Sequence, residues 1–330
     1  LSSLSIAFLL VWGALKVGGK TSVEIKSMYG QIIAFTLWIN QLYRPIRQLA
    51  DKFNILQRGT VRAERIFEIL DQDNHVQEDG TDTTCDFNQD IHIKKLTFSY
   101  TKEQNVLKNI NLILEKGKTI AFVGATGSGK TTIINLLGRF YDYEIGSISI
   151  GKTDLKSIDL NHLRSNIAIV LQDVFLFSDS IHNNITLGDK NITRDQVIIA
   201  SKAVGAHSFI TKLPGEYDYV IGERGASLSV GQRQLLAFIR AYLYNPSILI
   251  LDEATSSLDN ETEELIKLAT DKLTQNRTSI IIAHRLSTIQ KADSIVVLDK
   301  GEIVEQGSHQ YLIKKGGQYK NLFDKQFLED

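Results

Sequence analysis

The chain has 330 residues, 43% of them hydrophobic and 23% charged, which suits about two globular units. Lys and Arg total 37 and Asp and Glu total 38, so no strongly basic field exists, and nucleic acid is excluded as the default partner. The single cysteine, Cys85, excludes a disulfide-stapled secreted scaffold.

Two uncharged stretches, residues 1–15 and 27–43, lie near the beginning of the chain. Each approaches the ~17–25 apolar residues that a helix needs to cross a bilayer, and we expect two membrane helices there. Gln31, Asn40 and Gln41 would then face other helices or a cavity. Since no methionine or basic segment precedes the first stretch, we expect part of a longer protein and no signal peptide. A buried helical hairpin in a soluble protein is the alternative.

Charge and periodicity change after the second stretch. More cations follow it than precede it, which predicts that its downstream end lies in the cytoplasm. The following cations are Arg44, Arg47, Lys52, Arg58, Arg62 and Arg65, and the preceding ones are Lys16, Lys20 and Lys26. Residues 46–70 combine helical apolar spacing with many charges, which predicts an amphipathic helix, bent or loosened at Pro45. Residues 1–70 are therefore predicted to be all-α, and the acidic, aperiodic residues 71–90 to be a linker.

From Ile91 the pattern alternates between strands and helices, as in an α/β domain that we place at 91–326. The alternation from Ile91 to Tyr100 slips by one residue at Lys94-Lys95, which predicts a bulged strand. A buried-type strand, TIAFVG (119–124), leads into a glycine-rich loop and an apolar-periodic helix.

The glycine-rich loop, GATGSGKT (124–131), satisfies the phosphate-loop pattern GxxxxGK(S/T). Glycines let successive N–H groups point at phosphate oxygens, and the helix that follows adds its positive dipole end. We expect Lys130 to bridge the β- and γ-phosphates and Thr131 to ligate Mg²⁺. The candidate ATP-binding residues of this segment are Gly124, Ala125, Thr126, Gly127, Ser128, Gly129, Lys130, Thr131 and Thr132.

A second apolar strand, SILILDE (247–253), ends in two carboxylates. In a phosphate-loop enzyme Asp252 would hold Mg²⁺ through water and Glu253 would polarise the attacking water. Alone, two acids at a strand end are equally well explained as solvated residues. Together with the phosphate loop they favour ATP hydrolysis.

Three further motifs follow a fixed order around the carboxylates. LSVGQRQ (228–234) lies between the loop and the carboxylates, SSLD (256–259) follows them, and then comes IIIAHRLST (280–288). This order resembles the ATP-binding cassette (ABC) ATPases. The resemblance implies a phosphate-loop α/β core with a helical signature subdomain and an antiparallel β subdomain. It also implies an ATPase that uses ATP and Mg²⁺.

The resemblance assigns roles to single residues. Tyr100 is similar to the aromatic residue that stacks on adenine. Gln172 is similar to the glutamine that reaches Mg²⁺ and the attacking water, and His284 to the switch histidine at the γ-phosphate. Ser229, Val230, Gly231 and Gln232 form the signature, which caps the ATP held by the opposite subunit, and Asp259 is similar to the aspartate at the dimer seam.

Val230 departs from the family signature, which is usually LSGGQ. A β-branched side chain resists a positive φ and adds bulk near the γ-phosphate. We expect the signature to tolerate valine less well than glycine at this position, without loss of ATP hydrolysis.

Three segments resemble the exporter class of this family: VIGERGASLSVGQ (220–232), the tail from Gly301, and residues 42–70. Residues 42–70 are similar to the last membrane helix of a half-transporter and its continuation into the nucleotide-binding domain. The resemblance implies a second half-transporter chain, identical or different, as partner. It further implies a multi-pass location in the cytoplasmic membrane with the ATP-binding domain in the cytoplasm, and a transported lipid, drug or peptide.

Two other functions compete with the exporter. One is a soluble ABC-type ATPase acting on nucleic acid or ribosomes, which would need long coiled-coil insertions or two cassettes in one chain. The other is an unrelated phosphate-loop kinase, which should lack the signature and the switch histidine.

Overall fold

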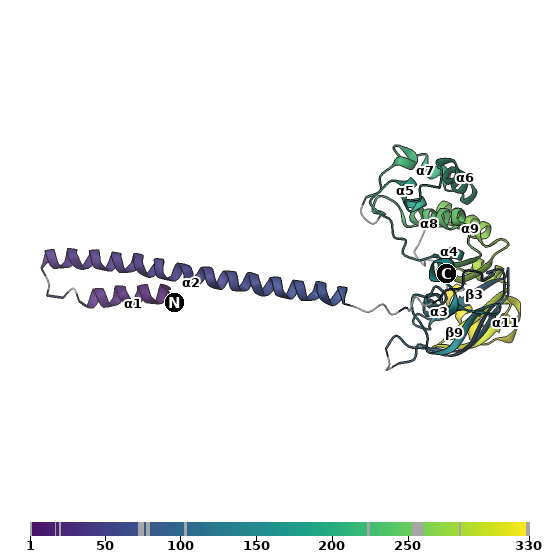
Figure 1. Ribbon diagram of the computed structural model, residues 1–330, viewed down its shortest axis with the longest axis horizontal. Helices are drawn as coiled ribbons and strands as arrows, with labels where there is room; N and C mark the ends of the chain where they lie inside the picture. Colours follow the sequence, from purple (N-terminus) through teal and green to yellow (C-terminus); the bar gives the residue numbers. More distant parts are fainter. Residues whose placement is uncertain are drawn as a thin grey trace. The chain divides into compact units, whose positions relative to one another are not determined.

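The computed structural model describes residues 2–16, 18–19, 21–71, 76, 80–101, 104–222, 225–252, 260–283 and 285–327 (Figure 1). The chain divides into two compact units, Leu1–Asn74 and His75–Asp330. Each unit is built differently, the first from helices alone and the second from sheets and helices.

The first unit is a helical hairpin of α1 (Ser2–Leu15) and α2 (Ser22–Leu70). Thr21 N donates to Glu24 Oε2 at 2.8 Å, which satisfies a free N–H group at the start of α2. The two helices pack closely where Gly13 meets Ile32, since a Cβ on Gly13 would lie 2.4 Å from Ile32 Cδ1. The predicted amphipathic helix is part of α2, which continues unbroken through Pro45.

Within the described residues, no helix combines the length and the hydropathy that crossing a bilayer requires.

The last part of the predicted linker belongs to the second unit. Asp82 N donates to Ser157 O at 3.0 Å, and Asp82 O accepts from Asp159 N at 2.9 Å. Cys85 and Phe87 are buried in the core of this unit. Their burial could not be read from the polar composition of residues 71–90, because each apolar side chain there is isolated among polar ones.

A four-stranded antiparallel sheet has the order β2-β1-β4-β5. Its strands are β1 (Ile91–Phe98), β2 (Leu107–Leu114), β4 (Ile145–Ile150) and β5 (Thr153–Asp154). The register of β1 against β2 shifts between Ile93 and Leu96, and Lys95 has a φ of 48°. The bulge predicted at Lys94-Lys95 is therefore confirmed.

A six-stranded sheet has the order β10-β9-β3-β8-β7-β6, parallel except for β10 at one edge. Its strands are β3 (Thr119–Val123), β6 (Ile167–Val170), β7 (Ile248–Asp252), β8 (Thr278–Ile282), β9 (Ser294–Asp299) and β10 (Glu302–Gly307). The carboxyl ends of the five parallel strands meet at one edge, where loops from distant parts of the sequence come together.

The helices surround this sheet. They are α3 (Lys130–Leu137), α4 (Leu160–Asn166), α5 (Ile181–Thr186), α6 (Arg194–Val204), α7 (His207–Ile210), α8 (Val230–Tyr244), α9 (Asn260–Thr274), α10 (Leu286–Lys291), α11 (His309–Lys315) and α12 (Gln318–Phe327), with short 3₁₀ turns η1 (Leu155–Ser157) and η2 (Glu216–Asp218). Figure 1 shows α5, α6 and α7 grouped beside α8 and α9 as a helical layer. The predicted α/β fold with an antiparallel subdomain and a helical subdomain is confirmed.

The six-stranded sheet separates two hydrophobic cores, because successive side chains of a strand point to opposite faces. Ile120 and Phe122 belong to the core shared with the antiparallel sheet and α3. Ala121 and Val123 belong to the core shared with α6, α8 and α9. Burial of β3 on both faces holds the loop that follows it in place.

Candidate nucleotide-binding site

The predicted phosphate loop connects β3 to α3. Gly124, Gly127 and Gly129 have φ values of 151°, 80° and 106°, which favour glycine. Space is also restricted, since a Cβ on Gly124 would lie 2.2 Å from Leu298 O and one on Gly129 would lie 2.7 Å from Leu107 Cδ2. The loop conformation and its packing therefore both require glycine at positions 124 and 129.

Lys130, the first residue of α3, turns its ammonium back into the loop. Its Nζ donates to Gly124 O at 2.7 Å and to Ala125 O at 3.0 Å, and lies 3.4 Å from Ser128 Oγ. Burial lowers the pKa of Lys130, and the nearby Asp252 carboxylate opposes this shift. These three acceptors are neutral, so a phosphate oxygen would be a stronger partner for the same ammonium.

Asp252 ends β7, two strands away from β3. The register aligns Phe122 of β3 with Ile282 of β8, and Ile282 with Asp252. Burial raises the pKa of Asp252 above its ordinary value, and the Lys130 ammonium offsets part of this rise. The strand order thus brings an ammonium and a carboxylate, 122 positions apart in the sequence, close enough to influence each other.

The other residues predicted at this edge are only partly described. Gln172 is exposed and follows the end of β6 by two residues. Glu253, Asp259 and His284 lie outside the described residues. Glu253 directly follows β7, and Ala283, next to His284, directly follows β8. The chemical roles of all these residues remain predictions.

Tyr100 lies beside α3. Its hydroxyl donates to Thr132 Oγ1 and accepts from Asn135 Nδ2, both at 3.2 Å. Its ring makes edge-to-face contacts with Phe98 and Tyr141, each with centroids 4.9 Å apart. Asn135 is not predictable from the sequence, because a single asparagine within an apolar-periodic helix belongs to no motif.

The signature segment forms the start of α8. Ser229 is the N-cap residue, and Gly231 is buried in the first turn. Val230 is the first helical residue and 37% exposed. Its backbone is helical, so this position demands no positive φ of valine, and the effect of Val230 on hydrolysis stays a prediction. No left-handed residue is required because the capped helix begins here.

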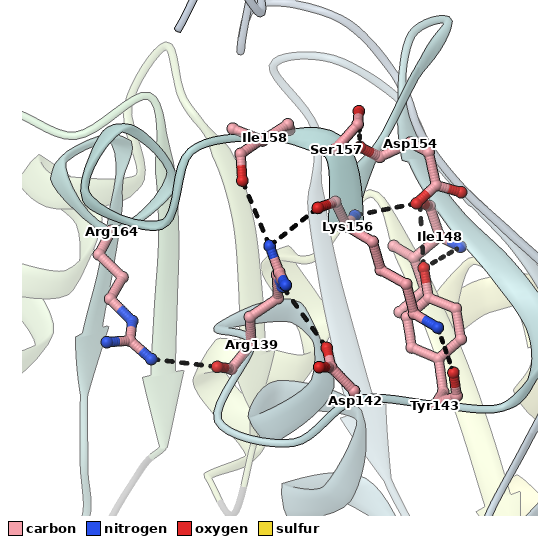
Figure 2. Close-up of polar contacts among 9 residues, drawn as sticks. All are labelled: Arg139, Asp142, Tyr143, Ile148, Asp154, Lys156, Ser157, Ile158 and Arg164. Atoms are coloured by element: carbon pink, nitrogen blue, oxygen red, sulfur yellow. Dashed lines mark hydrogen bonds and ion pairs between the residues drawn. The ribbon is translucent and has the colours of Figure 1, made fainter. Parts of the chain in front are cut away.

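A buried arginine, Arg139, connects the end of α3 to η1, which directly follows the antiparallel sheet (Figure 2). Only 1% of it is exposed. Its Nη1 donates to Lys156 O at 3.1 Å and to Ile158 O at 3.2 Å, and its own carbonyl accepts from Arg164 Nη2 at 3.1 Å. Because Arg139 follows α3 by two residues, this cluster fixes the end of the helix that begins at the phosphate loop. Sequence reasoning did not identify it.

A groove of about 520 Å³ lies between β6, the segment after Gln172 and α8. The exposed rings of Phe175 and Phe177 contribute to its lining. Arg240 Nε donates to Asn184 O at 2.6 Å, and Phe177 N donates to Asn184 Oδ1 at 2.8 Å. The segment that follows Gln172 is thereby bonded to the helix that begins at the signature.

The described side chains fit a nucleoside triphosphate and a hard divalent cation. A loop of three positive-φ glycines at the start of α3 has no room for side chains at two of them, and a buried ammonium lies inside it. Thr131 and Asp252 supply oxygen donors, which suit Mg²⁺. These features define a phosphate-loop nucleotide-binding domain.

Comparisons with known proteins agree with the assignment of a nucleotide-binding domain. Residues 107–256 match the family described as ABC transporter. The chain is 42% identical over 331 aligned positions to an "ATP-dependent lipid A-core flippase" of Syntrophus aciditrophicus (strain SB), covering 100% of this chain and 54% of the flippase. It is 40% identical over 327 positions to a "Probable multidrug resistance ABC transporter ATP-binding/permease protein YheH" of Bacillus subtilis (strain 168). This alignment covers 98% of this chain and 48% of the B. subtilis protein.

A solved bacterial Atm1-family ABC exporter with ATP bound is similar with a TM-score of 0.73 and 33% identity, covering 99% of this chain and 57% of that one. The α/β unit contains the ATP-binding ATPase domain of the ABC transporter family, and homologues that align with nearly the whole chain are ABC transporter proteins. It spans about half the length of the curated relatives it matches. The unrelated-kinase alternative is therefore wrong.

Proposed function

We propose that this chain is the C-terminal part of an ABC exporter half-transporter, which hydrolyses ATP and couples that hydrolysis to transport. The observation that carries the proposal is the glycine loop that holds the buried Lys130 ammonium, at the sheet edge where β7 ends in Asp252. Likeness to exporters over 98–100% of the chain supports the transport role.

The loop N–H groups and Lys130 would bind the β- and γ-phosphates of ATP. When ATP binds, Lys130 would exchange its hydrogen bonds to the carbonyls of Gly124 and Ala125 for bonds to phosphate oxygens. The loop would keep its conformation, because Leu298 and Leu107 pack closely against its glycines. Gly127, Ser128, Gly129, Thr131 and Thr132 complete the contacts that we propose for the triphosphate, with Ala125 and Thr126 at the exposed turn.

Mg²⁺ would be held by Thr131, Gln172 and Asp252, and when bound it neutralises charge on the phosphates. Burial raises the pKa of Asp252, and a bound Mg²⁺ would counteract this by stabilising the ionised carboxylate. Glu253 would accept a proton from the attacking water, and His284 would hydrogen-bond the γ-phosphate.

A second chain completes the site in this proposal. Ser229, Val230, Gly231 and Gln232 would contact the ATP of the opposite subunit, and Asp259 would lie at the seam. Donors on both sides of the γ-phosphate would make ATP bind the two halves together, and its hydrolysis would release them. The partner is a second half-transporter chain, identical to this one or different.

We place the whole protein in the cytoplasmic membrane, as a multi-pass protein with the ATPase domain in the cytoplasm. In the first unit many large apolar side chains are exposed, among them Phe8, Trp12, Phe35 and Trp38, which supports contact with lipid or further helices. The transported substrate belongs to the lipids, drugs or peptides, in keeping with relatives named for lipid A-core and multidrug resistance.

The test uses the full-length parent protein with Lys130→Ala and, as a matched control, Lys152→Ala at an exposed turn. We expect Lys130→Ala to abolish nucleotide binding and ATP hydrolysis, while the control keeps both. Tight ATP binding by Lys130→Ala would contradict the phosphate-loop role. A parent protein that stays in solution without detergent would contradict the exporter and favour a soluble ABC-type ATPase.

A further inference from the structure

Tyr100 is attached to the same helix that carries the phosphate loop. Its hydroxyl donates to Thr132 Oγ1 and accepts from Asn135 Nδ2, both at 3.2 Å. Thr132 and Asn135 are three residues apart in α3, so they lie on one face of that helix. Lys130, at the first position of the helix, is two residues before Thr132. One rigid element therefore connects the predicted base platform to the predicted phosphate site.

The ring of Tyr100 is also held from the side. Phe98 and Tyr141 contact it edge to face, at interplanar angles of 86° and 83°. Phe98 is buried in the core, which anchors the aromatic cluster. Tyr100 itself remains 46% exposed, so part of its surface is free to receive a planar ligand. A ring fixed before binding loses little conformational entropy when a base stacks on it.

We propose that Asn135 is a positioning residue that holds Tyr100 at a set place relative to the phosphate loop and so increases the affinity for the base end of the nucleotide. This inference rests on the proposed stacking of the base on Tyr100. Asn135 is the more informative of the two hydroxyl partners. Thr132 is nearly fully buried and is itself among the proposed triphosphate contacts, whereas Asn135 is half-buried and outside that set.

The proposal separates two parts of the ligand. If Asn135 acts through Tyr100, its loss should weaken binding of a ligand with a base and leave a ligand without a base unaffected. If Asn135 only stabilises α3, both ligands should respond alike, because the phosphate loop begins this helix. Inorganic tripolyphosphate with magnesium is the base-free probe, and ATP with magnesium is its partner.

The experiment measures both affinities by calorimetry on the full chain for Asn135→Ala, Tyr100→Phe and their double variant, with Tyr100→Ala as a separate test of the base platform. Asn161→Ala on α4, an exposed asparagine, is the matched control. We expect each single variant to weaken ATP about three- to tenfold, the range set by immobilising one side chain on binding. Tripolyphosphate affinity should stay within about twofold of wild type. The double variant should be no weaker than Tyr100→Phe alone, because that change already removes the hydrogen bond to Asn135.

Three results would overturn the inference. ATP affinity of Asn135→Ala equal to that of Asn161→Ala, with Tyr100→Ala clearly weakened, would reject the positioning role and leave the base platform standing. Unchanged ATP affinity in Tyr100→Ala would remove Tyr100 from the proposed site, and the inference with it. Equal weakening of ATP and tripolyphosphate in Asn135→Ala would show that Asn135 supports the phosphate loop and not the base.

Discussion

Ser229 and Gln232 bond each other in both directions at the start of α8. Ser229 Oγ accepts from Gln232 N at 3.2 Å, and Gln232 Oε1 accepts from Ser229 N at 3.0 Å. This capping box satisfies free N–H groups at the start of the helix. Two of the four predicted signature residues thus shape the helix end that we propose to face the ATP of a second chain.

Replacing Ser229 separates the cap from the proposed phosphate contact. Ser229→Ala removes the cap and should cost about 0.5–2 kcal/mol of stability as well as ATPase activity. Ser229→Asp keeps a capping side chain, but its carboxylate would repel a phosphate, so we expect near wild-type stability and at least about tenfold lower activity. Urea denaturation and steady-state ATPase assays measure the two effects. Wild-type activity in Ser229→Asp would remove Ser229 from the site.

Val230→Gly should change the ATPase rate by less than about twofold, because Val230 has a helical backbone that valine adopts without strain. Stability should fall by less than about 1 kcal/mol, since glycine is a poorer helix former. Steady-state kinetics and thermal unfolding provide the measurement. A large rise in rate would mean that the valine side chain obstructs the γ-phosphate.

Glu253→Gln should keep ATP affinity, lose steady-state turnover and accumulate an ATP-bound dimer, since the amide cannot accept the proton of the attacking water. Size-exclusion chromatography with ATP and a phosphate-release assay measure both outcomes. Glu264→Gln, which removes an exposed carboxylate on α9, is the control. Near-normal hydrolysis by Glu253→Gln would reject the general-base role.

Glu305 on β10 makes stability depend on pH. Burial raises its pKa, but hydrogen bonds from Tyr319 N, at 2.7 Å, and from Lys315 outweigh burial and hold the pKa below its ordinary value of 4.5. Its contribution is therefore present above about pH 4.5 and is lost as the pH falls through the lower folded-state pKa.

Glu305→Gln should accordingly be less stable than wild type at pH 7, and this difference should shrink below about pH 4.5. Urea denaturation across that range measures it, with the exposed Glu302→Gln on the same strand as control. A difference that stays constant with pH would contradict the assignment.

Arg139→Met should destabilise the α/β unit by about 3 kcal/mol or more, because two buried carbonyls, Lys156 O and Ile158 O, lose their guanidinium donor. Arg164→Ala removes one hydrogen bond from an exposed side chain and should cost about 1 kcal/mol or less. Chemical denaturation compares the two. Similar losses would mean that the Arg139 cluster is not a structural anchor.

Local patterns predicted much of the fold. The strand before Gly124, the helix after it and the bulge at Lys94-Lys95 depend on residues adjacent in the chain, and the structure confirms them. The packing of Cys85 and Phe87 was not predicted, because their partners come from other parts of the sequence.

The family resemblance, the alternation of strands and helices and the candidate residues are readable from spacing and periodicity, because these patterns act within a few residues of the chain. Which of these residues lie near one another depends on how the strands and layers pack. The Lys130 ammonium affects the pKa of Asp252 because a single strand, β8, separates β3 from β7. Tyr100 bonds Asn135 across 35 positions because β1 lies beside α3 in one core. Such contacts follow from the order of the strands in the sheet and the packing of the layers, which no short segment of the sequence specifies by itself.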